Sequence, residues 1–146
     1  MTIRAANAED LPAILGLYSE PDIDDGHVLD LQSAAVLFEK LKSYPDYHIY
    51  VAEIDNKIAG TFSLAIMDNL AHKGSKSGLI ESVVVSQSLQ GQGIGKKMMQ
   101  FAVELCREKS CYKVSLSSSL KRQNAHEFYK KLGFKIHGYS FLMELE

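Results

Sequence analysis

The chain has 146 residues, enough for one ordinary domain and short for two. Hydrophobic residues make up 46% and charged residues 23%, a balance that excludes a disordered tail, a collagen-like repeat and a disulfide scaffold. No stretch approaches the roughly 18 apolar residues that span a bilayer, and the N-terminus has no apolar signal core. We therefore expect one cytoplasmic domain over residues 1–146.

Charge is distributed unevenly along the chain. Residues 1–90 carry 6 Lys or Arg and 13 Asp or Glu, whereas residues 91–146 carry 10 and 5. A basic half suits an anionic ligand, but charge balance alone favours the simpler reading that both excesses lie on solvated faces. Cys106 and Cys111 fit neither a metal site nor a framework of bridges, so we expect both to be reduced thiols.

The spacing of apolar residues predicts the secondary structure. In chain order, we expect a strand at residues 3–5, helices at 8–19 and 31–42, a hairpin of strands at 48–54 and 58–67, a strand at 78–85, a helix from the glycine-rich segment 91–95 to about 109, a strand at 112–117, a helix at 123–132 and a final strand region at 134–145. This order, β-α-α-β-β-β-α-β-α-β, predicts an α/β (α+β) fold with a mixed central β-sheet flanked by helices.

Local signals set the ends of some of these helices. Asn7 is placed to cap the first helix, and Gly133 is placed to stop the last one. The second helix is expected to bury one apolar face. That face consists of Leu31, Ala34, Ala35, Leu37, Phe38 and Leu41.

The strongest local signal is the passage from the apolar strand Val83–Val85 to the glycine-rich segment that opens a helix. The first turn of a helix has unpaired N–H groups and the positive end of a dipole, and glycines let the backbone approach a bulky anion. The alternative is that the glycines simply form a turn. The spacing matches neither a Walker A loop nor the dinucleotide-binding fingerprint.

Two segments resemble motifs of one family. Gln90–Gly95 matches the Q/R-x-x-G-x-G/A loop of the GNAT superfamily of acyl-CoA-dependent N-acetyltransferases, and Asn124–Phe134 resembles its later motif of an Asn, a Phe-Tyr pair and a Gly-Phe helix stop. The resemblance implies the GNAT fold over the whole chain and acetyl-CoA as cosubstrate.

Two subgroups of this family resemble the chain most closely. Leu79–Val85 and Cys111–Val114 are similar to glucosamine-6-phosphate N-acetyltransferases, which usually carry an acid where this chain has Ser82. Ser117–Tyr129 is similar to aminoalkylphosphonate N-acetyltransferases.

The resemblance also implies which residues bind coenzyme A. Backbone N–H groups from Gln92 to Lys96 would hold the pyrophosphate, and the pantetheine arm would pair with the strand at Val83–Val85. Which of Lys96, Lys97, Lys130 and Lys131 meets the 3′-phosphate stays open. The full set of expected coenzyme-binding residues is Val83, Val84, Val85, Gln90, Gly91, Gln92, Gly93, Ile94, Gly95, Lys96 and Asn124.

Glu81 and Tyr129 are the expected catalytic residues. Glu81 is an acid within an apolar strand and would act as general base through water; the alternative is an acid paired with a lysine. The resemblance places Tyr129 to protonate the departing thiolate, whereas a lone tyrosine more often belongs to the core. Asn124 would hold pantetheine or orient its helix, and it also suits a helix cap.

The resulting hypothesis is an N-acetyltransferase that moves an acetyl group from acetyl-CoA to the primary amine of a small molecule, by direct attack in a ternary complex. The alternatives are an acyl-CoA-binding module without turnover and a protein or peptide N-acetyltransferase. The acceptor could be drawn by the acidic loop of Glu20, Asp22, Asp24 and Asp25 or by Lys121 and Arg122, and the sequence does not rank the two.

Further partners are predicted only weakly. The sequence shows no metal-ligand spacing, and we expect no metal, no nucleic acid and no membrane partner. A homodimer could form through the apolar residues 141–143 near the C-terminus, although an ordinary inner strand would use the same residues.

Overall fold

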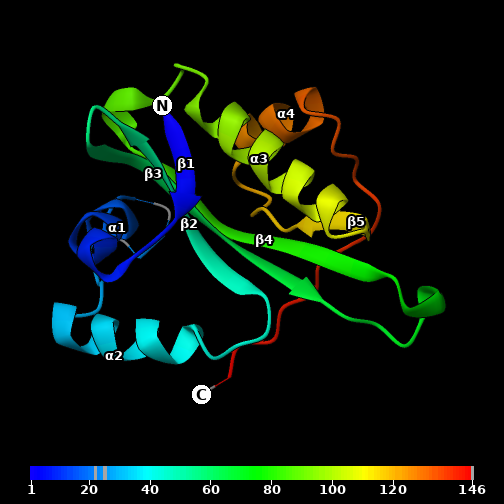
Figure 1. The fold of residues 1–146 in the computed structure, drawn as a ribbon. Helices are drawn as coiled ribbons and strands as arrows, with labels where there is room; N and C mark the ends of the chain where they lie inside the picture. The colour runs from blue at the N-terminus through cyan, green and yellow to red at the C-terminus, as the bar shows by residue number, and fades with distance from the viewer. Residues whose placement is uncertain (22, 25, 146) are drawn as a thin grey trace. The chain divides into compact units, whose positions relative to one another are not determined.

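The computed structural model describes residues 1–21, 23–24 and 26–145, and it divides into two compact units, residues 1–115 and 116–146 (Figure 1). None of the described helices has the length and apolar character needed to cross a membrane. The first unit contains β1 (Thr2–Ala5), the 3-10 helix η1 (Ala8–Asp10), α1 (Leu11–Tyr18), α2 (Leu31–Leu41), β2 (Tyr47–Ile54), β3 (Lys57–Met67), η2 (His72–Gly74), β4 (Lys76–Val85), η3 (Gln87–Leu89), α3 (Ile94–Glu108) and β5 (Cys111–Leu116), which ends at the boundary. The second unit contains α4 (Gln123–Lys131).

The five strands form one mixed sheet in the order β1-β2-β3-β4-β5. β1 to β4 pair antiparallel with their neighbours, whereas β5 follows the α3 crossover and runs in the direction of β4 (Figure 1). The expected mixed sheet with flanking helices is therefore confirmed. The tight β2–β3 turn uses Asp55 and Asn56, whose φ angles of 49° and 60° match the left-handed turn that twists with a hairpin.

Helices cover both faces of the central strand β3. Phe62 stacks on Tyr50 at 5.2 Å between ring centroids, and Tyr50 meets Phe101 of α3 edge-on at 5.4 Å. The residue that precedes Phe62 on β3, Thr61, faces Tyr18 of α1. Because neighbouring residues of a strand point to opposite faces, α1 and α3 lie on opposite sides of the sheet. The largest fully buried side chains are those of Phe62, Ile14, Leu64, Ile80, Met98, Met99, Val51, Thr61 and Cys106.

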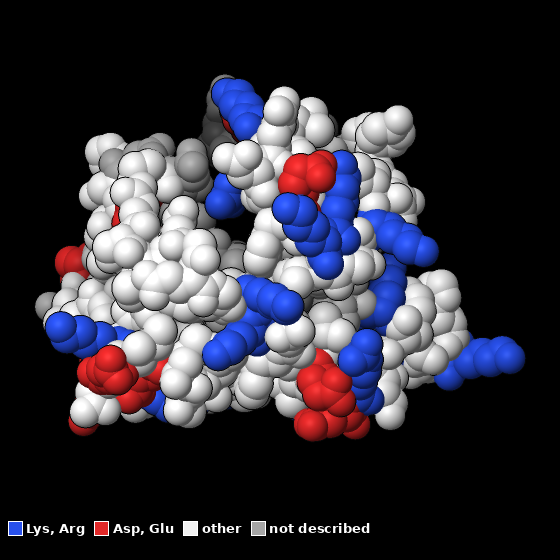
Figure 2. Space-filling model, turned by 90° about the horizontal axis from the view of Figure 1, so that it is seen from above, with Lys and Arg blue, Asp and Glu red and all other residues white. Residues whose placement is uncertain are grey.

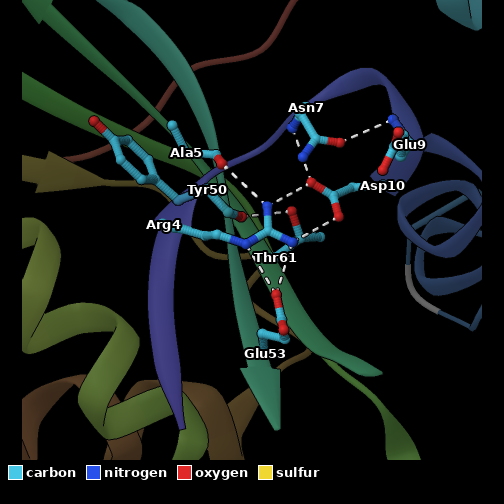
Figure 3. Close-up of polar contacts among 8 residues, drawn as sticks. All are labelled: Arg4, Ala5, Asn7, Glu9, Asp10, Tyr50, Glu53 and Thr61. Carbon is cyan, nitrogen blue, oxygen red and sulfur yellow. Dashed lines mark hydrogen bonds and ion pairs between the residues drawn. The ribbon is translucent and has the colours of Figure 1, made fainter. Parts of the chain in front are cut away.

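A partly buried ion-pair cluster connects the N-terminal strand to η1 and β2 (Figure 3). Arg4 donates to both carboxylate oxygens of Asp10 at 2.7 and 2.9 Å and to Glu53 at 2.9 Å. Asp10 also accepts from the backbone N–H of Asn7, while the Asn7 side chain accepts from Glu9 N–H, which confirms Asn7 as a helix cap. The cluster joins β1, η1 and β2, and the resulting hydrogen bonds stabilise the charged form of Asp10 and lower its pKa.

The second helix has the predicted bounds, but fewer of its apolar residues are buried than predicted. Ala34 and Phe38 are buried, whereas Leu31 and Leu37 are 51% and 42% exposed. α2 packs against α1, and its residues that do not face the packed side remain at the surface.

The expected final strand at residues 134–145 is wrong. In the described residues this segment forms no strand, and its large apolar side chains from Ile136 onward are exposed. A strand requires a partner to pair its backbone groups, and the second unit contains no other strand between residues 117 and 145. The alternative of an ordinary inner strand is thus not what the structure shows.

The charge asymmetry of the sequence does not form one continuous patch on the face drawn in Figure 2. Lysine and arginine side chains appear there in several groups, some with acidic side chains beside them. On that face, the distribution agrees with solvated charges rather than with a single anion-binding surface.

Candidate functional site

The glycine-rich loop leads directly into α3. Gly91 and Gly93 have left-handed φ angles of 78° and 81°, a conformation that glycine adopts without the steric cost of a Cβ atom. The helix begins at Ile94, whose side chain is buried, and no side chain of the described residues caps its N-terminus. The N–H groups of the first turn therefore face outward from an exposed loop, ready for an acceptor such as a phosphate oxygen.

Side-chain hydrogen bonds hold the connection between β4 and this loop. Gln90 Nε2 donates to the carbonyl of Val85 at 3.2 Å, so Gln90 folds back onto the end of β4. The carboxylate of Glu20, at the end of α1, accepts from the backbone N–H of Gln87 at 3.2 Å. Glu20 is thus bonded to the loop between β4 and α3. Of the other acids in its segment, Asp22 and Asp25 lie outside the described residues.

A β-bulge interrupts β4 at the expected catalytic residue. Ser63 of β3 lies opposite Glu81, and Thr61 lies opposite Val84, so the single residue Phe62 faces both Ser82 and Val83. Ser82 has a φ angle of 51°, an uncommon conformation for a residue other than glycine. Bulges of this kind often lie next to active sites because they redirect a side chain.

Glu81 is exposed at this bulge instead of being buried in the strand. Its neighbour Ile80 is 1% exposed, whereas Glu81 and Ser82 both lie on the surface. No lysine or arginine nitrogen of the described chain lies within 4.0 Å of the Glu81 carboxylate, so the alternative of a lysine-paired acid is not observed. The carboxylate is open to water.

The outer edge of β4 extends past the end of β5. Ser115 donates through Oγ to the carbonyl of Gly78 at 3.4 Å, and β5 ends one residue later. Because the two strands run in the same direction with nearly the same rise, β5 ends beside about Ile80. Residues Glu81–Val85 of β4 extend beyond the end of β5, so β5 does not pair with the backbone groups of this part of β4.

The other expected site residues belong to the second unit. Tyr129 packs edge-on between Phe128 and Phe134, with ring centroids 5.1 and 5.8 Å away. Burial raises the pKa of its phenol, a rise that the nearby positive charge of Arg122 partly offsets. α4 ends at Lys131 with Leu132 as its C-cap, and Gly133 directly after the cap has a left-handed φ angle of 93°, as expected for a helix stop.

Asn124 is exposed in the first turn of α4. The residue at the N-cap is Arg122, so the alternative of Asn124 as the helix cap is wrong. The amide of Asn124 makes no hydrogen bond with the described residues. It is therefore free to bind a ligand.

The residues of β4 and the glycine-rich loop that we expect to bind coenzyme A form one continuous stretch of the first unit, together with Glu81. Asn124 and Tyr129 lie in the second unit, each on α4. The residue that the sequence analysis missed is Ser82, whose bulge sets the exposure of Glu81. The sequence did offer a signal for this bulge. Glu81 and Ser82 are two adjacent polar residues in an otherwise apolar strand, and they break its regular pattern.

Comparison with known proteins identifies the family. The sequence model of the Acetyltransferase (GNAT) family matches residues 11–134. The chain belongs to the GNAT acetyltransferase family. The matched residues include the glycine-rich loop, the bulged strand and the motif of α4.

Individual GNAT relatives agree with this assignment. Glucosamine 6-phosphate N-acetyltransferase of Arabidopsis thaliana is 36% identical over 99 residues, which span 66% of this chain and 64% of the relative. Aminoalkylphosphonate N-acetyltransferase of Salmonella typhimurium is 29% identical over 143 residues, which span 98% and 90%. The crystal structure of the Arabidopsis enzyme superimposes with a TM-score of 0.86 at 28% identity, over 99% of this chain and 98% of that one.

Proposed function

We propose that this chain transfers an acetyl group from acetyl-CoA to the primary amine of a small molecule, by direct attack in a ternary complex. The observation that carries the proposal is the continuous run from the bulge at Ser82, along the open edge of β4, to the left-handed glycines and uncapped N-terminus of α3. In a member of the GNAT family, this run provides the features that an acyl thioester of coenzyme A requires.

The residues present fit coenzyme A. Its pyrophosphate would accept hydrogen bonds from the N–H groups of Gln92–Lys96, where the helix dipole favours negative charge. Its pantetheine amides would pair with the backbone of Val83–Val85, whose outer edge β5 leaves open. Asn124 would bind the same arm through its unbonded amide, and the coenzyme supplies the acetyl group as a thioester.

Glu81 would act as general base. A simple alkylamine has a pKa of about 10, so it must lose a proton before its nitrogen can attack. The exposed carboxylate at the bulge can receive that proton through a water molecule. The nitrogen then forms a bond to the acetyl carbon as the bond from that carbon to sulfur breaks.

Tyr129 would protonate the departing sulfur. A proton donor must keep its proton at working pH, and the raised pKa of this half-buried phenol meets that condition. One proton thus leaves the ammonium toward Glu81 before attack, and Tyr129 gives one to the departing thiolate. The second N–H proton, released once the C–N bond has formed, returns to the Tyr129 phenolate through water, so the transfer balances in protons and charge.

The acceptor is proposed only as a class. The two relatives described above act, by name, on an amino sugar phosphate and on aminoalkylphosphonates, which are small amines that carry a phosphorus group. Lys121 and Arg122 would favour such an acceptor through charge-assisted hydrogen bonds. The engagement of Glu20 with Gln87 weakens the competing role of the acidic loop.

A thiol-release assay with acetyl-CoA tests the proposal. The panel contains amino sugars and their phosphates, aminoalkylphosphonates, polyamines and peptides, and titration calorimetry measures coenzyme A binding in parallel. Turnover with a small amine supports the proposal. Binding without turnover on any amine would identify a binding module, turnover on peptides alone would identify a peptide acetyltransferase, and absence of coenzyme binding would refute all three.

We further propose a cytoplasmic homodimer. Phe141, Leu142 and Met143 are exposed in the described chain, and apolar surface of this kind favours burial against a second copy. Light scattering coupled to size exclusion tests the dimer, and a monomeric mass at micromolar concentration contradicts it.

A further inference from the structure

Ser63 is a buried polar residue on the central strand β3. It is 3% exposed, and its sequence neighbours Phe62 and Leu64 are also buried. Its Oγ atom donates a hydrogen bond to the carbonyl oxygen of Glu81 at 3.2 Å. Burying a hydroxyl costs free energy unless the hydroxyl makes a hydrogen bond. This hydrogen bond therefore offsets the cost of burying Ser63 in β3.

The accepting carbonyl belongs to the peptide that enters the bulge. That peptide joins Glu81 to Ser82, and Ser82 holds the left-handed φ angle of 51°. For a residue with a Cβ atom, this conformation costs about 1–2 kcal/mol. It persists only where surrounding contacts fix the peptide, and the Ser63 hydroxyl is such a contact.

The orientation of this peptide decides where the Glu81 side chain points. A strand alternates its side chains between two faces, and a change of one residue in register moves them to the opposite face. The bulge lies between the Thr61–Val84 pair and the Ser63–Glu81 pair, so relaxing it would force one side of β4 to shift. Fixing the carbonyl of Glu81 therefore fixes the direction of its carboxylate.

We propose that Ser63 is a positioning residue for acetyl transfer: its hydroxyl holds the Glu81–Ser82 peptide in the bulge and keeps the Glu81 carboxylate in place. This inference rests on the proposed function, in which Glu81 is the general base. Ser63 itself touches neither substrate nor coenzyme in this assignment.

The same strand offers a matched control. Thr61 is 0% exposed and lies two residues before Ser63, on the same face of β3. Its Oγ1 atom donates to a backbone carbonyl at 2.9 Å, but that carbonyl belongs to Tyr50 on β2, on the side away from the bulge. Loss of either hydroxyl removes a buried hydrogen bond to a backbone carbonyl, and Thr61→Val also removes the contact of Thr61 with the Tyr18 hydroxyl. Only the Ser63 bond reaches Glu81.

The experiment compares Ser63→Ala, Ser63→Thr and Thr61→Val in the full chain. We expect Ser63→Ala and Thr61→Val to lose similar thermal stability, while only Ser63→Ala loses about tenfold in kcat with its KM for acetyl-CoA nearly unchanged. Ser63→Thr keeps the hydroxyl and should recover most of kcat. Unchanged kcat in Ser63→Ala, or an equal loss in Thr61→Val, would overturn the proposal.

A readout that needs no turnover separates this inference from the proposed function. Backbone chemical shifts of Ser82 report its left-handed conformation in the wild-type chain. In Ser63→Ala they should move toward extended values, and in Thr61→Val they should not. If the wild type acetylates no amine, the proposed function fails, and unchanged Ser82 shifts in Ser63→Ala would independently refute the role of Ser63.

Discussion

Gly91 and Gly93 hold the same left-handed backbone conformation on either side of Gln92, with φ angles of 78° and 81°. A Cβ atom at either position would meet no other atom within 4 Å, so these glycines are required by conformation and not by crowding. Their alternation turns successive N–H groups toward one side, an arrangement that forms an anion-binding concavity. This geometry makes the loop a site that can be tested by small substitutions.

Gly93→Ala should weaken coenzyme A binding. The added Cβ disfavours the left-handed conformation by about 1–2 kcal/mol, and the loop can relax only by turning its N–H groups away from the pyrophosphate. We therefore expect the dissociation constant measured by calorimetry to rise about tenfold.

Gly74→Ala is the matched control for this change. Gly74 has a φ angle of 76°, and its Cβ position lies 3.8 Å from the Asn69 carbonyl, an ordinary contact. It carries the same backbone strain in the β3–β4 loop and should leave coenzyme A affinity unchanged. Equal affinities for wild type and Gly93→Ala would show that the loop does not bind the pyrophosphate.

Glu81→Gln should lower turnover while the acceptor amine is protonated. The amide cannot accept the proton, so kcat should fall by about 10²-fold at neutral pH and the deficit should shrink as pH approaches the amine pKa. A pH–rate profile of the acetyl-transfer reaction measures this. Glu39→Gln, an exposed carboxylate on α2, should behave as wild type, and a wild-type profile for Glu81→Gln would remove Glu81 from the mechanism.

Tyr129→Phe should lower kcat and leave coenzyme A affinity nearly intact. The ring keeps its packing against Phe128 and Phe134, so only the phenol proton is lost. We expect a decrease of about 10²-fold in kcat. Tyr139→Phe removes a phenol from an exposed residue of the same unit and should have no effect, so similar losses in both variants would contradict the role as acid.

The pKa of Tyr129 also determines how activity should change at alkaline pH. Burial raises the Tyr129 pKa above its ordinary value of 10.0, and the protonated form is the active one. The acid therefore stays intact up to and beyond pH 10, and activity should not decline through loss of this proton at lower pH. A tyrosine ionisation below pH 10, followed by ultraviolet difference spectroscopy against Tyr129→Phe, would contradict this.

Local patterns carried most of the fold prediction. The capping position of Asn7, the glycines before α3 and the stop at Gly133 each act within a few residues, and each is found as expected. The segment 134–145 failed for the opposite reason. Its composition suits a strand, but pairing depends on a partner edge that composition does not encode.

The sequence predicts the elements that carry the candidate site, but not the backbone conformation of its strand. Loop residues 90–96 and the strand before them follow from sequence because strand, loop and helix occur in order. The bulge at Ser82 depends instead on how β3 and β4 register with each other, a relation between residues about 20 positions apart in the sequence. The exposure of Glu81 and the bond from Ser63 both derive from it.

Gly60→Ala should destabilise the sheet, because β3 and α3 leave no room for a methyl group. Its Cβ would lie 2.8 Å from Met98 Sδ and 2.9 Å from the backbone carbonyl of Val84, and the carbonyl cannot move without disturbing the ladder. We expect a loss of about 1–3 kcal/mol in the free energy of unfolding, measured by urea denaturation. Gly16→Ala has open space within helix α1 and should stabilise by about 0.5–1 kcal/mol, so a loss in both variants would contradict this account.

Asp10→Asn should destabilise the chain most at neutral pH and progressively less in acid. Hydrogen bonds from Arg4 lower the Asp10 pKa below its ordinary 3.8, so its contribution is fully present above that value and is lost as pH falls through the folded-state pKa. The amide replaces a charged acceptor of the partly exposed Arg4 by a neutral one, at a cost of about 1 kcal/mol once solvent screening is included. Urea denaturation at several pH values measures the difference in the free energy of unfolding between wild type and variant.

Asp68→Asn is the control for this change. Asp68 is an exposed carboxylate 3.9 Å from Lys76 Nζ, and its substitution should cause almost no such difference at any pH. A gap for Asp10→Asn that stays constant as pH falls below 3.8 would show that the ion pair in Figure 3 does not stabilise the fold.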